Sequence, residues 1–69
     1  MDIKVNGEPM ALPAGQSGLV DVLALIGLAI DQAGIAVALN MELVPRSEWL
    51  ATVVKSGDEI EVITARQGG

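Results

Sequence analysis

The two glycines at the end of the sequence, Gly68 and Gly69, are the residues with the clearest capacity for chemistry. They follow an alternating apolar run at residues 59–65, so the sequence predicts a strand that leads into a carboxylate without bulky neighbours. Because glycine has no Cβ, such a tail can pass through a narrow channel and adopt backbone angles that other residues resist. We therefore expect Gly69 to present a carboxylate that another protein can activate, although two glycines alone are also typical of a frayed chain end.

The composition argues against catalysis by the chain itself. The sequence contains no cysteine and no histidine, so it lacks the strongest side-chain nucleophile, the commonest general base and the commonest metal ligand. The acidic pairs Glu42/Glu48 and Glu59/Glu61 lack the dense ligand spacing of a calcium loop, and we interpret them as surface charges. The aliphatic core leaves little room for a large ligand cavity. We expect no catalytic residue, bound cofactor or metal in this chain.

The charge balance favours a protein partner over a nucleic acid or a membrane. Nine acidic and four basic residues give a formal net charge of −5, which repels phosphate backbones. The longest apolar stretch, residues 19–30, is interrupted by Asp21 and is shorter than the ~20 residues that span a bilayer. The first four residues show no secretory signal pattern. We expect a cytoplasmic protein whose acidity attracts a basic partner surface or simply maintains solubility.

The first half of the chain predicts a hairpin and a helix. Ile3 and Val5 alternate with polar residues, as in a half-buried strand. Asn6-Gly7 is typical of a tight turn that returns residues 10–12 antiparallel to the first strand. Apolar residues at helical spacing then predict one helix, with Ser17 as a plausible N-cap and Gly27 as the C-terminal stop. The apolar stripe consists of Leu19, Val22, Leu23 and Ile26.

The second half predicts three more strands. Residues 35–39 alternate large and small apolar side chains, with the large ones facing the helix. Residues 43–44 form a short strand, and residues 45–49 an irregular or single-turn segment, since proline cannot donate to a central ladder. Trp49 is the single aromatic residue, and we expect it to close one end of the core instead of anchoring a partner. Arg46 is expected to be solvated or to pair with acidic groups of a partner.

The final strand is expected to carry a docking surface. If residues 60, 62 and 64 face the helix, strand alternation places Glu61, Ile63 and Ala65 on the exposed face of the sheet, beside the tail. We predict that these residues dock partner proteins, although scattered exposed apolar residues are also normal on protein surfaces. Residues 66–69 reach about 13 Å when extended, at ~3.3 Å per residue. The body of the domain can therefore stay outside a partner's active site that Gly69 enters.

The order of these elements predicts an α+β protein with the β-grasp (ubiquitin-like) fold. A ββαββ arrangement forms a mixed sheet packed on one helix, with the first and last strands adjacent and parallel at the centre. We predict one β-grasp domain over residues 1–65 and a flexible C-terminal diglycine tail over residues 66–69.

Three segments of the sequence resemble the ThiS family, ubiquitin-like bacterial sulfur carriers of thiamin biosynthesis. The first is Val-Asn-Gly-Glu at residues 5–8. The second is residues 36–40 followed by Val-Pro-Arg-Ser-Glu-Trp at residues 44–49, and the third is residues 57–65 before the diglycine. One departure is Met41, where the family often has glycine after the asparagine of the second turn. The geometry of that turn is therefore in question.

The resemblance implies a carrier that partner enzymes modify. An E1-like (ThiF-like) adenylyltransferase would use MgATP to join the Gly69 carboxylate to AMP, and a sulfur-donating persulfide protein would supply the sulfur that replaces AMP. The resulting thiocarboxylate would deliver its sulfur to a ThiG-like thiazole synthase. Gly68, Gln67 and Arg66 would thread into the partner active sites, although an arginine near a terminus is often only solvated. The chain would be a protein cosubstrate and not an enzyme.

Two other functions remain open from the residues alone. Another diglycine carrier, either the small subunit of molybdopterin synthase or a ubiquitin-like tag joined to lysines, would use the same terminus. The absence of phenylalanine argues against the molybdopterin version, whose first strand is often rich in that residue. A β-grasp interaction module would use neither glycine for chemistry.

Overall fold

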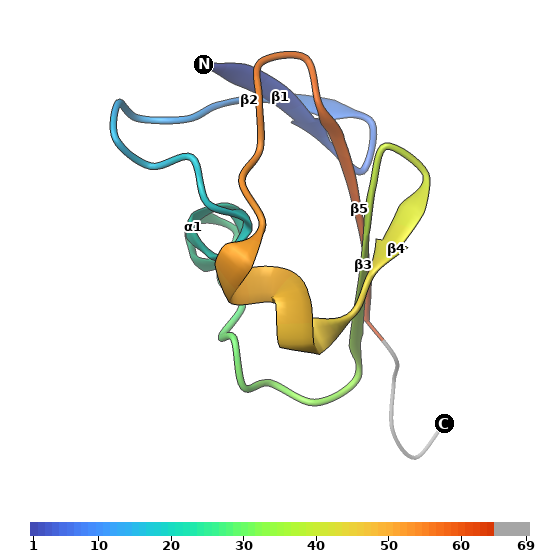
Figure 1. Ribbon diagram of the computed structural model, residues 1–69. Helices are drawn as coiled ribbons and strands as arrows, with labels where there is room; N and C mark the ends of the chain where they lie inside the picture. The colour runs from blue at the N-terminus through green and yellow to red at the C-terminus, as the bar shows by residue number, and fades with distance from the viewer. Residues whose placement is uncertain (65–69) are drawn as a thin grey trace.

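Alternating apolar residues fold into a sheet that curves around an α-helix (Figure 1). The structure is a computed structural model and describes residues 1–64. The described residues form a five-stranded sheet in the order β2-β1-β5-β3-β4. Its elements, in chain order, are β1 (Asp2–Val5), β2 (Glu8–Ala11), α1 (Leu19–Leu25), β3 (Ile35–Leu39), β4 (Glu42–Val44), the 3₁₀-helix η1 (Arg46–Ala51) and β5 (Glu59–Thr64).

The last strand lies in the middle of the sheet. β5 runs parallel to β1, with Val5 opposite Ile60. On its other edge β5 runs antiparallel to β3, from Leu39 opposite Ile60 to Ile35 opposite Thr64. This arrangement confirms the predicted β-grasp fold. β5 is thus paired on both edges at Ile60 by earlier parts of the chain, and the pairing with β3 continues to Thr64.

The core is aliphatic apart from one indole ring. Buried side chains from the sheet face those of α1, and buried residues on the connecting segments close the ends of this layer. Each fully buried aliphatic side chain contributes roughly 1.5–3 kcal/mol relative to its exposed state. The buried residues are Ile3, Val5, Leu12, Leu19, Val22, Leu23, Val37, Trp49, Val54 and Ile60.

The N-terminus of α1 differs from the prediction, because Gly18 and not Ser17 is the N-cap. The Gly18 N–H donates to Oδ2 of Asp21 at 3.1 Å, and an acidic side chain in the first turn also suits the positive end of the helix dipole. Ser17 has a different role, since its carbonyl accepts the Val54 N–H at 2.8 Å. The helix start is therefore joined to the segment that precedes β5.

α1 ends one residue before Ile26, the last residue of the predicted apolar stripe. The helix ends at Leu25, and Ile26 is an exposed C-cap; the prediction that Ile26 packs in the core was wrong. The Gly27 N–H donates to Ala24 O and the Leu28 N–H donates to Leu23 O, at 3.0 and 2.9 Å. These two bonds form a Schellman motif, and the φ of Gly27 is 87°, so the predicted glycine stop is confirmed.

The turn between β3 and β4 is a two-residue hairpin. Leu39 pairs with Glu42, and the two residues between them, Asn40 and Met41, have φ values of 51° and 71°. Positive φ at both central positions is the geometry of a type I′ turn, which favours asparagine followed by glycine. Met41 thus adopts a conformation in which its Cβ is unfavourable.

Replacing Met41 with glycine is expected to raise the free energy of unfolding by about 1 kcal/mol, because the left-handed conformation costs a non-glycine residue roughly 1–2 kcal/mol. The Met41 side chain is 85% exposed, so the substitution removes almost no packing. Urea unfolding followed by circular dichroism measures the change. Leu50→Gly, at an 80% exposed position without positive φ, is the matched control and should lower stability; a loss in both variants would contradict this account.

The segment after β4 is a 3₁₀-helix that carries Trp49 into the core. The Trp49 side chain is 1% exposed, and its Nε1–H donates to the Val44 carbonyl at 2.9 Å. This burial agrees with a structural role and leaves the indole inaccessible to a partner.

Arg46 is exposed, in agreement with the expectation of a solvated side chain, but its guanidinium also makes contacts within the chain that the sequence did not indicate. Its guanidinium stacks over the Trp49 ring, 4.3 Å from the centroid. It also donates to the carbonyls of Ile30 and Gln32, the latter at 2.6 Å. Arg46 therefore ties the loop after α1 to η1.

Candidate functional site

The structure places two of the predicted site residues on the exposed face of β5. Glu61 and Ile63 are both exposed, and Ile63 retains 66% of its accessible surface. The remaining predicted site residues lie outside the described residues. They are the docking residue Ala65, the threading residues Arg66, Gln67 and Gly68, and the modification site Gly69.

Ile63 belongs to an apolar patch on the face of the sheet that lies away from α1. Ile63 pairs with Ala36 across β5 and β3, and Ala38 pairs with Leu43 across β3 and β4. Paired residues project to the same face, so two small alanines lie between two larger side chains. We call Ala36, Ala38, Leu43 and Ile63 the sheet patch. Glu61, opposite Ala38, places a carboxylate at its border.

Leu43 is a member of the patch that the sequence analysis missed. Its side chain is 71% exposed. Residues 43–44 were too few to show an alternation by themselves, and the register of the β3–β4 hairpin is what places Leu43 opposite Ala38. A two-residue turn at Asn40 and Met41 fixes that register. The signal in the sequence that indicates this position is the turn at residues 40–41, because its length sets the register.

β5 brings the chain from the core to the surface over its own length. Ile60 is buried, Val62 is half-buried and Thr64 is exposed. The expectation that Thr64 lies on the buried face is therefore wrong, because its side chain is exposed. One cause is that β1 pairs with β5 only as far as Ile60, so the sheet narrows beside the last residues of the strand.

A buried carboxylate supports the beginning of β5. Asp58 accepts hydrogen bonds from Asn40 Nδ2 at 3.0 Å and from the Lys55 N–H at 2.7 Å. The hydrogen bond from the Asn40 side chain is the main reason that the pKa of Asp58 lies below its usual value. Burial opposes this effect by raising the pKa, and the bond from the Lys55 N–H lowers it further. Asp58 thus acts as a structural carboxylate that joins the β3–β4 turn to the segment before β5.

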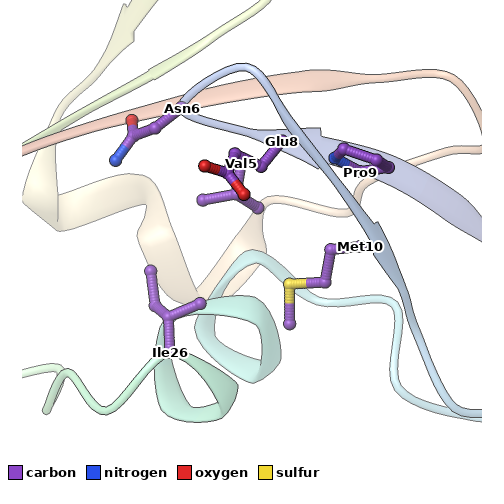
Figure 2. A pocket seen from close by; sticks show the side chains of 6 residues that line it. All are labelled: Val5, Asn6, Glu8, Pro9, Met10 and Ile26. Carbon is purple, nitrogen blue, oxygen red and sulfur yellow. The ribbon is translucent and has the colours of Figure 1, made fainter.

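A surface groove lies between the β1–β2 hairpin and the C-terminal end of α1 (Figure 2). Its volume is about 380 Å³, and its lining is mostly apolar. Glu8 is the one ionisable side chain among the lining residues, which are Val5, Asn6, Glu8, Pro9, Met10 and Ile26. The lining contains one carboxylate, no nucleophilic side chain and no second charged side chain, so it does not indicate a reaction in the groove.

Within residues 1–64, no group of three or more His, Cys, Asp and Glu side chains is placed to hold a metal ion. No helix among these residues has the length and apolar character needed to cross a membrane.

Comparison with known proteins identifies relatives along the whole chain. The model of the ThiS family matches residues 3–69. The sulfur carrier protein ThiS of Escherichia coli K12 is 39% identical over 69 residues, covering 100% of both chains. A thiazole synthase of Paramagnetospirillum magneticum is 34% identical over 70 residues; the alignment covers 100% of this chain, which spans only 20% of the length of that relative.

Two solved structures share the fold. A crystal structure of the thiamine biosynthesis protein ThiS from Geobacter metallireducens matches with a TM-score of 0.80, 33% identity and complete coverage of both chains. A solution structure of a thiamine biosynthesis protein from the same organism matches with a TM-score of 0.77 and 34% identity, covering 100% of this chain and 88% of that chain.

Proposed function

The chain belongs to the ThiS family and is a sulfur carrier of thiamin biosynthesis, and from this premise we propose that Gly69 is the residue that carries the sulfur. The observation that supports this choice is the extent of the family match, which runs through the diglycine to residue 69. The Escherichia coli carrier is likewise covered from end to end.

The proposed reaction at Gly69 begins with activation of a poor electrophile. A carboxylate oxygen attacks the α-phosphorus of ATP, pyrophosphate leaves, and the product is a mixed anhydride with AMP. A persulfide sulfur then attacks the carbonyl carbon and expels AMP. Cleavage of the sulfur–sulfur bond by a thiol leaves the thiocarboxylate. In this proposal MgATP is a substrate of an E1-like adenylyltransferase. The persulfide and the thiol are supplied by partner proteins, which include a sulfur donor.

The residues of this chain suit a substrate of that reaction. With no cysteine or histidine in the sequence, the chain lacks the groups most often used for nucleophilic and acid–base catalysis. Its contribution is to present the terminus and to dock. We place the cycle in the cytoplasm, where MgATP is available and protein thiols stay reduced.

We propose a thiazole synthase as the protein that accepts the sulfur. The thiazole synthase of Paramagnetospirillum magneticum contains a segment that is similar to the whole of this chain. A carrier-like segment within a thiazole synthase is consistent with two proteins that work in contact. The sheet patch together with Glu61 is the proposed docking surface for the partner enzymes.

The Ile63→Lys variant is expected to weaken binding to the adenylyltransferase at least tenfold. Burying a charge in place of an apolar contact at the centre of an interface costs of the order of 2 kcal/mol or more. The free energy of unfolding should change by less than about 1 kcal/mol, because Ile63 is largely exposed. Titration calorimetry gives the affinity. Leu50→Lys places the same charge on η1, outside the sheet patch, and should bind normally; equal affinity of all three proteins would reject this surface.

Intact mass spectrometry tests the proposed function directly. The protein is incubated with the adenylyltransferase, MgATP and a persulfide donor, and replacement of one terminal oxygen by sulfur is the expected product. Thiazole formation by a thiazole synthase should then depend on this product, whereas transfer to a molybdopterin synthase large subunit would point to the other carrier class. A protein that stays unmodified under these conditions would refute the proposal.

A further inference from the structure

Two asparagines hold opposite edges of β5 by the same device. Asn6 and Asn40 each begin a two-residue hairpin turn, with φ values of 53° and 51°. Oδ1 of Asn6 accepts the Val62 N–H at 2.8 Å, and Oδ1 of Asn40 accepts the Glu59 N–H at 2.9 Å. Each side chain therefore serves a turn and at the same time takes the place of a backbone carbonyl in the ladder of β5.

The bond between Val62 and Asn6 lies in the half of β5 that leads toward Gly69. The register of β1 with β5 stops at Val5 opposite Ile60, and the Asn6 N–H donates to the Ile60 carbonyl at 2.8 Å. The chain then turns away through Gly7. Val62 lies beyond this point, so its N–H reaches no β1 backbone carbonyl in the register and is bonded by the Asn6 side chain instead.

Figure 2 shows this placement. The Asn6 side chain lies at one end of the groove, beside the ribbon of β5, whereas Met10 and Pro9 line the part of the groove farther along the hairpin. On the opposite edge of β5, the pairing with β3 continues to Ile35 opposite Thr64. Without the Asn6 bond, the last residues of β5 would be held from the β3 side and would lose this support on the β1 side.

We propose that Asn6 is a positioning residue for the reaction at Gly69, acting through Val62. This inference rests on the proposed function. The docking residue Ile63 directly follows Val62, so the bond fixes the strand at the junction between the docking surface and the segment that enters the active site. A partner that binds both parts at once gains from receiving them in a fixed relation, because ordering them on binding costs conformational entropy.

The entropy cost of ordering the end of β5 determines which kinetic constant should change. The end of β5 must be ordered before any chemistry occurs, so the loss affects the bound ground state and the transition state equally. Such a loss raises KM and leaves kcat nearly unchanged. We expect Asn6→Gly to lower kcat/KM for adenylation by about tenfold, almost entirely through KM.

Glycine is the informative substitution because it retains the positive φ of the turn while it removes the side-chain oxygen. Asn40→Gly is the matched control, since it makes the same change in a turn of the same type and releases Glu59 at the other end of β5. It also removes the bond to Asp58, so its stability loss should be at least as large. Asn6→Asp retains an acceptor oxygen and tolerates positive φ, and it should restore kinetics close to wild type.

Amide hydrogen exchange and adenylation kinetics, measured on the same four proteins, test the inference. Asn6→Gly should speed exchange of the Val62 amide and raise KM, whereas Asn40→Gly should speed exchange at Glu59 and leave kcat/KM within about twofold of wild type. Unchanged Val62 exchange in Asn6→Gly, or KM rising equally in both glycine variants, would overturn the positioning role.

Failure of the proposed function gives a different result. In that case the wild-type protein itself is not adenylated, and the positioning role is lost with it. Val62 exchange is measured without any partner, so it still shows whether Asn6 holds the end of β5.

Discussion

Deletion of Gly69 is expected to reduce thiocarboxylate formation at least 100-fold. The new terminal carboxylate, on Gly68, would end about 3.3–3.6 Å short of its normal reach. A misplacement of ~1 Å at a reacting group can already cost about 100-fold in rate. The shortened chain can recover this distance only if the body of the domain moves closer to the active site, which docking through the proposed surface would oppose. Intact mass spectrometry of the product over time measures the effect.

The deletion should leave the folded domain unchanged, because the core side chains and the strand pairings of the sheet are formed among residues 1–64. Circular dichroism and urea unfolding verify this. A variant with one alanine added after Gly69 is a second test, since it displaces the carboxylate in the opposite direction and should be equally inactive. Normal conversion of the shortened chain would contradict the requirement for a carboxylate at residue 69, whereas a β-grasp module whose diglycine has no chemistry would form no thiocarboxylate with or without Gly69.

The elements predicted best from the sequence are those whose signal is local. Ile3 and Val5 alternate with polar residues, and Asn6-Gly7 dictates a two-residue turn, so the first hairpin follows from a few adjacent positions. The exposure of Ile63 follows from the same period of two, counted from the buried Ile60 and the half-buried Val62. The parallel contact of β1 with β5 needed the order of all elements, which the β-grasp pattern supplied.

The features that were missed depend on contacts between distant segments. Ser17 has a side chain suited to capping, but its backbone is bonded to Val54, and the helix begins one residue later. Arg46 is bonded to the loop 14 and 16 residues earlier in the chain, and nothing in the residues around it indicates this. Asn6 was recognised for its turn conformation, while its bond to Val62 spans 56 residues.

Some properties of the candidate site follow from its own residues, and others needed the family resemblance or the structure. Glycine at residues 68 and 69 indicates conformational freedom and lack of bulk, which limits what kinds of channel the segment can enter. The chemistry assigned to Gly69 came from the resemblance of whole segments to a family and not from the two glycines. Leu43 shows the converse: its place beside Ala38 is a matter of register, and family resemblance did not point to it.

Replacing Trp49 with alanine is expected to lower the free energy of unfolding by about 3–5 kcal/mol. The indole is almost completely buried, and its loss leaves a cavity among the aliphatic residues of a small core. Removing the ring also deprives Arg46 of its stacking partner and the Val44 carbonyl of a donor. A 69-residue domain has a total stability of roughly 3–10 kcal/mol, so a large share of the variant should be unfolded.

Trp49→Phe separates packing from hydrogen bonding in this position. It keeps an aromatic ring under Arg46 but removes the Nε1–H, so a smaller loss of about 1–2 kcal/mol is expected. Urea unfolding followed by circular dichroism gives both values.

The two tryptophan variants should lose sulfur transfer in proportion to their unfolded fraction, and lowering the temperature toward that of maximum stability should restore it in Trp49→Phe. The Gly69 deletion should remain inactive at every temperature, because its defect is a displaced carboxylate on a folded domain; a Trp49→Ala protein as stable as wild type would contradict the structural role of the indole.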